Sequence, residues 1–331
     1  MAAITREALV FHRIRISRGG MSPLRDVGYL AQIGSVIRAV RPDLLHNITV
    51  KPIVYGTIAA RGLGVPRIVN AISGLGYAFC GGRSRQLLSG LVRAAYRASL
   101  GHHDIRVIFQ NKDDVETFVN ARIIDPAQAV LIRGSGIDLD AFSYSTEPWG
   151  TPRVVLPARM LRDKGIIEFA QAARWLRSQG CNAVFLLAGM TDKGNPASLW
   201  ERDLLRLQLD TGVQWLGHVG GMPALLRDAH VVCLPSYREG LPKALMEACA
   251  VGRPIVTTDV PGCREAVANE TNGLLVKPRN VEMLRDALGR LLSDPALRAR
   301  MGVAGRRKAE TEFDINTTVR ATLELYLSML D

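Results

Sequence analysis

The pattern that most constrains the fold is an alternation of short apolar runs with helical patterns, which occurs twice in the 331 residues. The first series has strand patterns at 43–46, 67–71, 105–110 and 129–132, beside helical patterns at 27–38, 52–61, 84–100 and 113–120. The second has strand patterns at 154–157, 183–188, 214–216, 231–235, 254–258 and 273–276, beside helical patterns at 166–178, 198–210, 222–228 and 242–251. Strands that alternate with helices pair in parallel through crossover connections, so each series predicts an α/β domain.

The predicted domain boundary lies in DLDAFSYSTEPWGTPR (138–153), which contains turn residues and no hydrophobic period. We therefore expect an α/β fold with two Rossmann-like domains that face each other across a cleft. The first domain covers 1–140 and the second covers 150–310. A C-terminal helix at 311–331 is expected to pack back toward the first domain, since the tail is helical from Asn280 onward.

The two predicted domains are unequal, because the first has about four strands and the second about six. The chain begins with MAAITREALVFHRIRISRGG, which has neither the strand nor the glycine-rich turn that normally opens such a domain. A strand-helix-strand unit takes roughly 30 or more residues. We therefore expect the first domain to be incomplete, with Met1 an internal or mis-assigned start or the chain a natural truncation.

Cysteine usage and hydropathy favour the cytoplasm. The five cysteines are far apart and form no CxxC pair, which argues against a disulfide framework and against a thiolate metal site. No stretch of 18 or more apolar residues is present, and the start lacks the apolar core of a signal peptide.

Positive charge is concentrated in the first third of the chain. The formal net charge is +11, and residues 1–110 alone hold 15 Lys and Arg against 4 Asp and Glu. Such a surface attracts nucleic acid, anionic lipid or a phosphorylated substrate. The helical pattern at 84–100 is amphipathic and basic, so it either lies on a membrane or covers a core.

In a parallel α/β sheet, ligands bind at the carboxyl ends of the strands. The loops that follow Pro157, Gly189, Gly217, Pro235 and Thr258 are therefore the places to look for chemistry.

The most informative of these loops lies in LPSYREGLPKALMEACAVGRPIVTTDVPG, where a buried strand leads through Glu239 and Gly240 into a helix. The amino end of a helix favours a phosphate or another anion, and carboxylates accept hydrogen bonds from sugar hydroxyls. Glu247 lies eight positions after Glu239, among apolar residues where an unpaired carboxylate is costly. We interpret both carboxylates as candidate binding groups.

A second loop, in PARMLRDKGIIEF, carries Arg159, Arg162 and Lys164 between a strand and a helix. Three cations in one loop attract an anion. Together with the helix start after Glu239, they predict a clamp for a diphosphate across two neighbouring loops.

These motifs resemble family 4 retaining glycosyltransferases of the GT-B fold. The resemblance rests on the spacing within EGLPKALMEA, on GRPIVTTDVPG and NGLLVKP, and on the pair Arg159 and Lys164. It spans roughly residues 40–320, and the segments HNITVKPIVYGTIAARGLGVP, GLGYAF and FQNKDD are similar to bacterial enzymes that extend lipid-linked oligosaccharides and O-antigen repeats.

The resemblance implies roles for particular residues. Glu239 would contact the donor sugar and Glu247 the nucleotide ribose, while Arg159 and Lys164 would hold the departing diphosphate. The backbone at Gly240 and Leu241, and the loop at Gly217, complete the expected donor site.

The first domain offers fewer candidates. Many relatives place a histidine or an acid after the strand at 67–71, but this chain has NAISGLG there. His46 is the nearest candidate for a base. We expect Gly74 and Gly76 to line the acceptor side, because SGLGYAFCGG lacks the spacing and the acidic partner of a dinucleotide-binding loop.

No metal or other cofactor is expected, because two cations and a helix start can stabilise the leaving group. The alternative is a metal bound by the DxD sequence Asp138-Leu139-Asp140, where Asp is otherwise a turn former.

The sequence thus predicts a retaining hexosyltransferase that moves a sugar from a nucleotide diphosphate, a UDP-sugar by resemblance, to a lipid-linked or polysaccharide-repeat acceptor. It would serve lipopolysaccharide or O-antigen biosynthesis as a cytoplasmic enzyme, peripheral on the anionic inner face of the cytoplasmic membrane. The alternatives are a nucleotide-sugar 2-epimerase and an inactive, truncated transferase. A nucleic-acid-binding protein is disfavoured, since aromatic residues make up 6% of the chain and do not alternate with basic ones.

Overall fold

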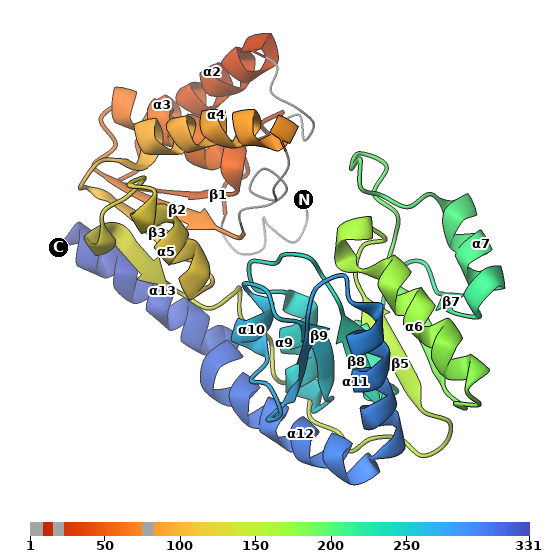
Figure 1. The fold of residues 1–331 in the computed structure, drawn as a ribbon. Helices are drawn as coiled ribbons and strands as arrows, with labels where there is room; N and C mark the ends of the chain where they lie inside the picture. Colours follow the sequence, from red (N-terminus) through yellow and green to blue (C-terminus); the bar gives the residue numbers. More distant parts are fainter. Residues whose placement is uncertain (1–8, 16–22, 75–82) are drawn as a thin grey trace.

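A computed structural model describes residues 9–15, 23–74 and 83–331, which form two α/β domains (Figure 1). Among the described residues, the first domain contains four strands and their crossover helices. Its elements are α2 (Pro23–Val40), β1 (Leu44–Ile48), η1 (Pro52–Gly56), α3 (Thr57–Gly62), β2 (Arg67–Ile72), α4 (Arg83–Leu100), β3 (Ile105–Phe109), α5 (Lys112–Asn120), η3 (Pro126–Gln128) and β4 (Ala129–Leu131).

The first sheet is parallel and has the strand order β1-β2-β3-β4. Leu44 pairs with Arg67, and Ile68 pairs in turn with Ile105. Buried side chains from β2, β3 and the helices form one core, in which Phe109 and Phe118 meet edge to face. All four strands predicted for this half are therefore present.

The second domain contains six strands. Its elements are β5 (Arg153–Pro157), η4 (Arg162–Lys164), α6 (Ile166–Ser178), β6 (Val184–Ala188), α7 (Glu201–Thr211), β7 (Gln214–Trp215), α8 (Met222–Arg227), β8 (Val231–Leu234), α9 (Lys243–Val251), β9 (Ile255–Thr258), α10 (Cys263–Ala266), β10 (Gly273–Val276) and α11 (Val281–Ser293). The helix predicted from 198 begins at Glu201, because Asp203 accepts a hydrogen bond from the Trp200 backbone N–H and so marks the helix start there.

The order of the second sheet, β10-β9-β8-β5-β6-β7, reverses direction between β5 and β8. The chain winds outward from β5 through β6 and β7, returns to the other side of β5 at β8, and winds outward again. Ligands of such sheets bind outside the carboxyl ends of the strands, at the point where the strand order reverses. The predicted donor-site residues Lys164 and Glu239 lie on the loops after β5 and β8.

The predicted linker, 138–153, has neither helix nor strand from 138 to 152, as its composition predicts, and β5 begins at its last residue, Arg153. The fully buried guanidinium of Arg253 holds it in place, with hydrogen bonds from Nη1 to the Ser145 carbonyl (2.7 Å) and from Nη2 to the Thr146 carbonyl (3.0 Å). The amino-acid pattern did not indicate this contact.

The C-terminal elements are α12 (Pro295–Lys308), η5 (Ala309–Phe313) and α13 (Ile315–Leu330). They follow the second domain and then return to the first, where α13 lies alongside it in Figure 1. Met329 is buried against Val69, Ile108 and Ile132 of the first domain. Within the described ranges, no helix is both long enough and apolar enough to cross a bilayer.

Candidate functional site

The loops after β5 and β8 touch at the point where the second sheet reverses. Gly165, just after β5, has a left-handed backbone (φ 74°), and a Cβ there would lie 2.3 Å from the Pro235 carbonyl oxygen. Only glycine fits this approach. The Tyr237 backbone N–H also donates to the Asp163 carbonyl (2.9 Å), so the two loops form one rigid unit.

Lys164 and Glu239 form an ion pair across these two loops, with 20% and 11% of their side chains exposed. The Ser236 hydroxyl donates to the same Glu239 oxygen at 2.6 Å, and Thr258 donates to the Ser236 carbonyl. The carboxylate is thus held by a cation and a hydroxyl. The structure confirms that the two predicted loops are neighbours.

Arg159 lies on the same loop as Lys164 but is oriented differently. Its guanidinium is 60% exposed and pairs with Asp192 (2.6 Å) rather than with Glu239. Of the three predicted cations, the structure brings Lys164 into contact with Glu239. A part for Arg159 in a diphosphate clamp remains a prediction.

Gly217 follows β7 and accepts a hydrogen bond from the Gly189 backbone N–H at 2.8 Å. Gly189 in turn approaches the loop after β5 so closely that a Cβ there would lie 1.9 Å from the Ala158 carbonyl oxygen. The loops after β5, β6 and β7 are therefore stacked along one edge of the sheet.

Glu247 lies in α9 and is 9% exposed, as the apolar residues around it suggest. Burial raises the pKa of its carboxyl group above the usual range, and Lys243, with its Nζ 3.8 Å from the carboxylate, partly offsets this. A carboxylate held at this cost in an otherwise apolar helix is a strong candidate for a binding group.

The predicted backbone residues Gly240 and Leu241 are both buried, and Leu241 packs in the core of the second domain. Gly240 meets the first domain: a Cβ on it would lie 2.4 Å from the Ser73 carbonyl oxygen. Gly74 has φ 121°, and a Cβ there would lie 3.1 Å from the Gly240 Cα. The acceptor-side loop and the donor loop therefore touch at Gly74, while Gly76 lies outside the described residues.

The structure does not bring His46 to this junction. Its Nδ1 lies 2.5 Å from the Tyr326 hydroxyl of α13, on the face of the first sheet that α13 covers. Burial lowers the pKa of the imidazole and favours its neutral form. The sequence suggested His46 as a base because it lies near the carboxyl end of a strand. Its side chain, however, points to the sheet face that packs on α13, so we do not place it in the site.

The DxD sequence, Asp138-Leu139-Asp140, begins with a residue that forms a turn. Asp138 Oδ1 accepts hydrogen bonds from the backbone N–H groups of Asp140 and Ala141, both at 3.0 Å, which is the turn-forming use of aspartate. That use confirms Asp138 as a turn former.

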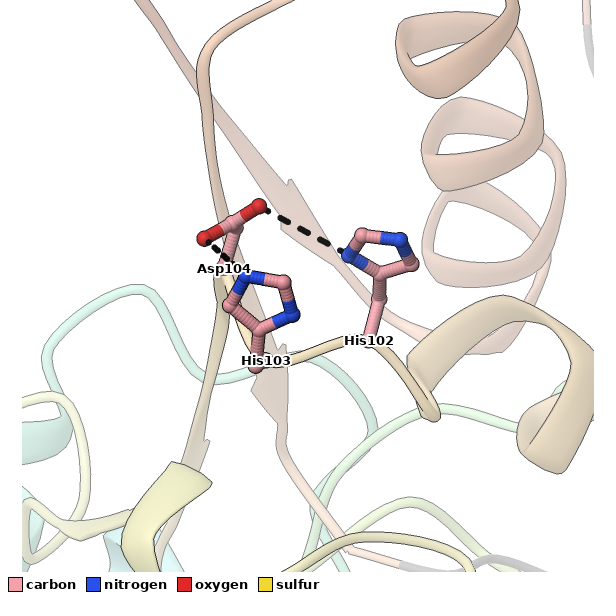
Figure 2. Close-up of side chains that lie close together, drawn as sticks. All are labelled: His102, His103 and Asp104. Atoms are coloured by element: carbon pink, nitrogen blue, oxygen red, sulfur yellow. Dashed lines mark ion pairs between the residues drawn. The ribbon is translucent and has the colours of Figure 1, made fainter.

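Among the described residues, one group of side chains has metal-ligand composition: His102, His103 and Asp104 (Figure 2). The Asp104 carboxylate lies 3.1 Å from His103 Nε2 and 3.7 Å from His102 Nδ1. This loop precedes β3, so it lies at the amino end of the sheet, whereas the junction with Gly240 is at the carboxyl ends. The cluster is separate from the site.

Three residues of the junction were missed by the sequence interpretation: Asn111, Asp114 and Arg238. Asn111 donates from Nδ2 to the Gly240 carbonyl (2.7 Å), and Arg238 donates to Asp114 (2.7 Å). A signal for Asn111 existed, since it follows a buried strand and caps a helix.

The two α/β domains meet where the loop after β8 reaches the first domain, which is the arrangement predicted as the GT-B fold. Residues 143–308 match the family model described as glycosyl transferases group 1, and residues 3–111 match the model described as glycosyl transferase 4-like. The chain therefore belongs to the group 1 glycosyltransferases and is an enzyme of that class.

Two curated relatives align with nearly the whole chain. N,N'-diacetylbacillosaminyl-diphospho-undecaprenol alpha-1,3-N-acetylgalactosaminyltransferase of Campylobacter jejuni is 29% identical over 327 residues, covering 94% of this chain and 83% of the relative. UDP-Gal:alpha-D-GlcNAc-diphosphoundecaprenol alpha-1,3-galactosyltransferase of Escherichia coli is 25% identical over 325 residues, covering 94% and 81%.

Solved structures share the fold. Sucrose-phosphate synthase from Thermosynechococcus elongatus superposes with a TM-score of 0.79 at 21% identity, covering 96% of this chain and 82% of that one. HepE of Anabaena, in complex with UDP and glucose, also gives a TM-score of 0.79, at 18% identity and with 99% and 88% coverage. These likenesses confirm the predicted GT-B fold.

Proposed function

We propose that this glycosyltransferase moves a sugar from a UDP-sugar to a sugar carried on a polyprenyl diphosphate, with retention of the anomeric configuration. The observation that carries the proposal is the Lys164–Glu239 pair at the switch point, and the buried Glu247 of α9, on the helix that follows Glu239, supports it. The names of both curated relatives include a diphospho-undecaprenol acceptor, and one of them names UDP-Gal.

The pair provides the groups that sugar transfer needs. When the bond between the anomeric carbon and the phosphate oxygen breaks, both electrons go to the departing diphosphate, and the sugar becomes oxocarbenium-like. Lys164 would stabilise that negative charge, and Glu239 would accept hydrogen bonds from sugar hydroxyls. The acceptor hydroxyl would then bond to the anomeric carbon and transfer its proton to the departing diphosphate.

Donor binding would rearrange the ion pair. Glu239 neutralises Lys164 in the ion pair. A diphosphate carries more charge than one carboxylate, so it would compete for the ammonium group and free Glu239 for the sugar. Glu247, on the following helix, would bind the nucleotide ribose through its carboxylate.

We further propose that the reaction needs no metal, because protein cations meet the leaving-group charge. Activity should then survive EDTA. Loss of activity in EDTA with recovery on addition of Mg²⁺ or Mn²⁺ would overturn this part of the proposal.

The basic first third of the chain would bring the enzyme to its acceptor on the cytoplasmic face of the membrane. Residues 1–110 hold all of the net charge of +11. Sedimentation with vesicles should rise with phosphatidylglycerol content and fall with salt, since salt screens an electrostatic contact. Sedimentation that is indifferent to both would contradict a peripheral membrane location.

The proposed function is tested first by a thermal-shift panel of nucleotide sugars, because a ligand that binds the folded state stabilises it. The stabilising donor is then incubated with a synthetic polyprenyl-diphosphate-linked sugar, and the product is identified by mass spectrometry. Addition of one sugar to the lipid supports the proposal. Interconversion of the donor without acceptor would instead indicate a 2-epimerase.

A further inference from the structure

A buried polar network joins the first domain to the loop that carries Glu239. Asn111 is fully buried and caps α5, where its Oδ1 accepts from the Asp114 backbone N–H at 2.8 Å. Its Nδ2 group donates to Asp114 Oδ2 at 3.0 Å and, across the junction, to the Gly240 carbonyl at 2.7 Å. One amide side chain thus serves a helix of the first domain and a backbone group of the second.

Asp114 makes the second connection across the junction. Its carboxylate, with 1% of the side chain exposed, accepts from Nη2 of Arg238 at 2.7 Å. Arg238 immediately precedes Glu239, and its Nε is buried without a hydrogen-bond partner. The guanidinium is therefore held toward Asp114 at some cost to its own hydrogen bonding.

The neighbours of Asp114 determine how readily its carboxyl group is charged. Burial raises the pKa of Asp114, and hydrogen bonds from Asn111 and Arg238 and the Arg238 charge lower it. Asp113, the next residue, adds a small raising effect. Asn111, which contacts the Glu239 loop, and Arg238, which lies on it, are thus the residues that favour the charged form of Asp114.

We propose that Asn111 and Asp114 are positioning residues, which hold the segment Arg238–Glu239–Gly240 in the orientation that presents Glu239 to the donor sugar when the two domains are together. The proposal rests on the proposed function of Glu239. It explains why a residue of the donor site is fixed from the opposite domain.

The contacts also couple domain arrangement to the site. The chain crosses between the domains at Ile137, which exchanges backbone hydrogen bonds with Phe313 and Ile315 (2.7 and 3.0 Å). Rotation about this crossing would separate Asn111 from Gly240 and Asp114 from Arg238, so the loop would lose its external support whenever the domains part.

The adjacent residue provides a matched control. Asp113 pairs with Arg264 at 2.8 Å across the same junction, but Arg264 lies in α10 and not on the Glu239 loop. Asp113→Asn and Asp114→Asn therefore make the same chemical change, at neighbouring positions of one helix, on pairs that span the same interface.

In transfer assays, Asp114→Asn should lower kcat on the order of 10-fold to 10²-fold, as small misplacements of a reacting group do, while the Kd for UDP and the KM for donor change by less than about twofold. Asp113→Asn should leave kcat within about twofold of wild type. Arg238→Gln should reproduce the Asp114→Asn result from the other side. The double variant should lose no more than either single variant.

Hydrogen exchange separates this inference from the proposed function, because it needs no substrate. Backbone amides at 236–242 should exchange faster in Asp114→Asn and in Arg238→Gln than in wild type, and those in Asp113→Asn should not. If wild type transfers no sugar, the proposed function fails. Hydrogen exchange still tests whether Asp114 and Arg238 hold the loop at 236–242 in place. Equal exchange in the Asp113 and Asp114 variants would overturn the inference, as would equal losses of kcat and UDP affinity.

Discussion

Replacing Gly240 with alanine perturbs the junction without changing any charge. A Cβ on this residue would lie 2.4 Å from the Ser73 carbonyl oxygen and 2.9 Å from Oε1 of Gln110, both in the first domain. Gly240 itself does not have the left-handed backbone that would strain an alanine. The substitution therefore opposes the approach of the two domains while leaving the second domain able to fold.

The size of the effect follows from the geometry. Real Cβ atoms essentially never approach other atoms closer than 3.0 Å, so the backbone at Ser73 and Gly240 must move apart by at least 0.6 Å. A misplacement of about 1 Å costs on the order of 10²-fold in rate, which is about 2.7 kcal/mol of transition-state stabilisation. We expect kcat to fall by roughly 10-fold to 10²-fold, with UDP binding nearly unchanged.

The assay compares kcat, the Kd for UDP and the unfolding temperature for Gly240→Ala and for Gly28→Ala. Gly28 lies in α2, and a Cβ there has nothing within 4 Å, so the same chemical change meets open space. A Gly240→Ala enzyme with the turnover of the Gly28→Ala control would refute the view that the domains meet at Gly240 during the reaction. Loss of UDP binding in parallel with kcat would instead indicate damage to the second domain.

Lys164→Ala and Arg159→Ala should each lower turnover on the order of 10²-fold or more, as losses of one charge at a leaving group do, and unchanged turnover in both would remove the diphosphate clamp. Glu247→Ala should weaken UDP binding measured by calorimetry, whereas Glu239→Gln should leave it nearly intact and damage transfer; the reverse pattern would exchange the two roles. Because burial raises the pKa of Glu247, its destabilising effect is absent below the unfolded pKa of about 4.3, grows as pH rises from there to the higher folded pKa, and is constant above that. Glu247→Gln should therefore raise the melting temperature at pH 7. It should leave the melting temperature unchanged near pH 3.5, about one unit below the unfolded pKa. An increase at both pH values would show that the charge of the carboxylate is not the cause.

How far the sequence predicts this site depends on which contacts are local. The loops that carry Lys164 and Glu239 could be placed side by side in advance, since both follow strands that a parallel sheet brings to one edge; the ion pair between the two side chains could not. The contacts of Gly240 with Ser73 and Asn111 could not, because they depend on how the two domains are placed, which no hydrophobic period encodes. His46 shows the same limit within one strand: neighbouring residues point to opposite faces, and only the structure reveals which face α13 covers.

The central claim is that Lys164 receives the diphosphate of a nucleotide-sugar donor during transfer to a lipid-linked acceptor. The most direct measurement follows UDP release by wild type and by Lys164→Ala, with and without a polyprenyl-diphosphate-linked sugar. The account predicts rapid release by wild type only when the acceptor is present, and release on the order of 10²-fold slower by the variant. UDP release that does not depend on the acceptor, or that is equally fast in both proteins, would contradict this account.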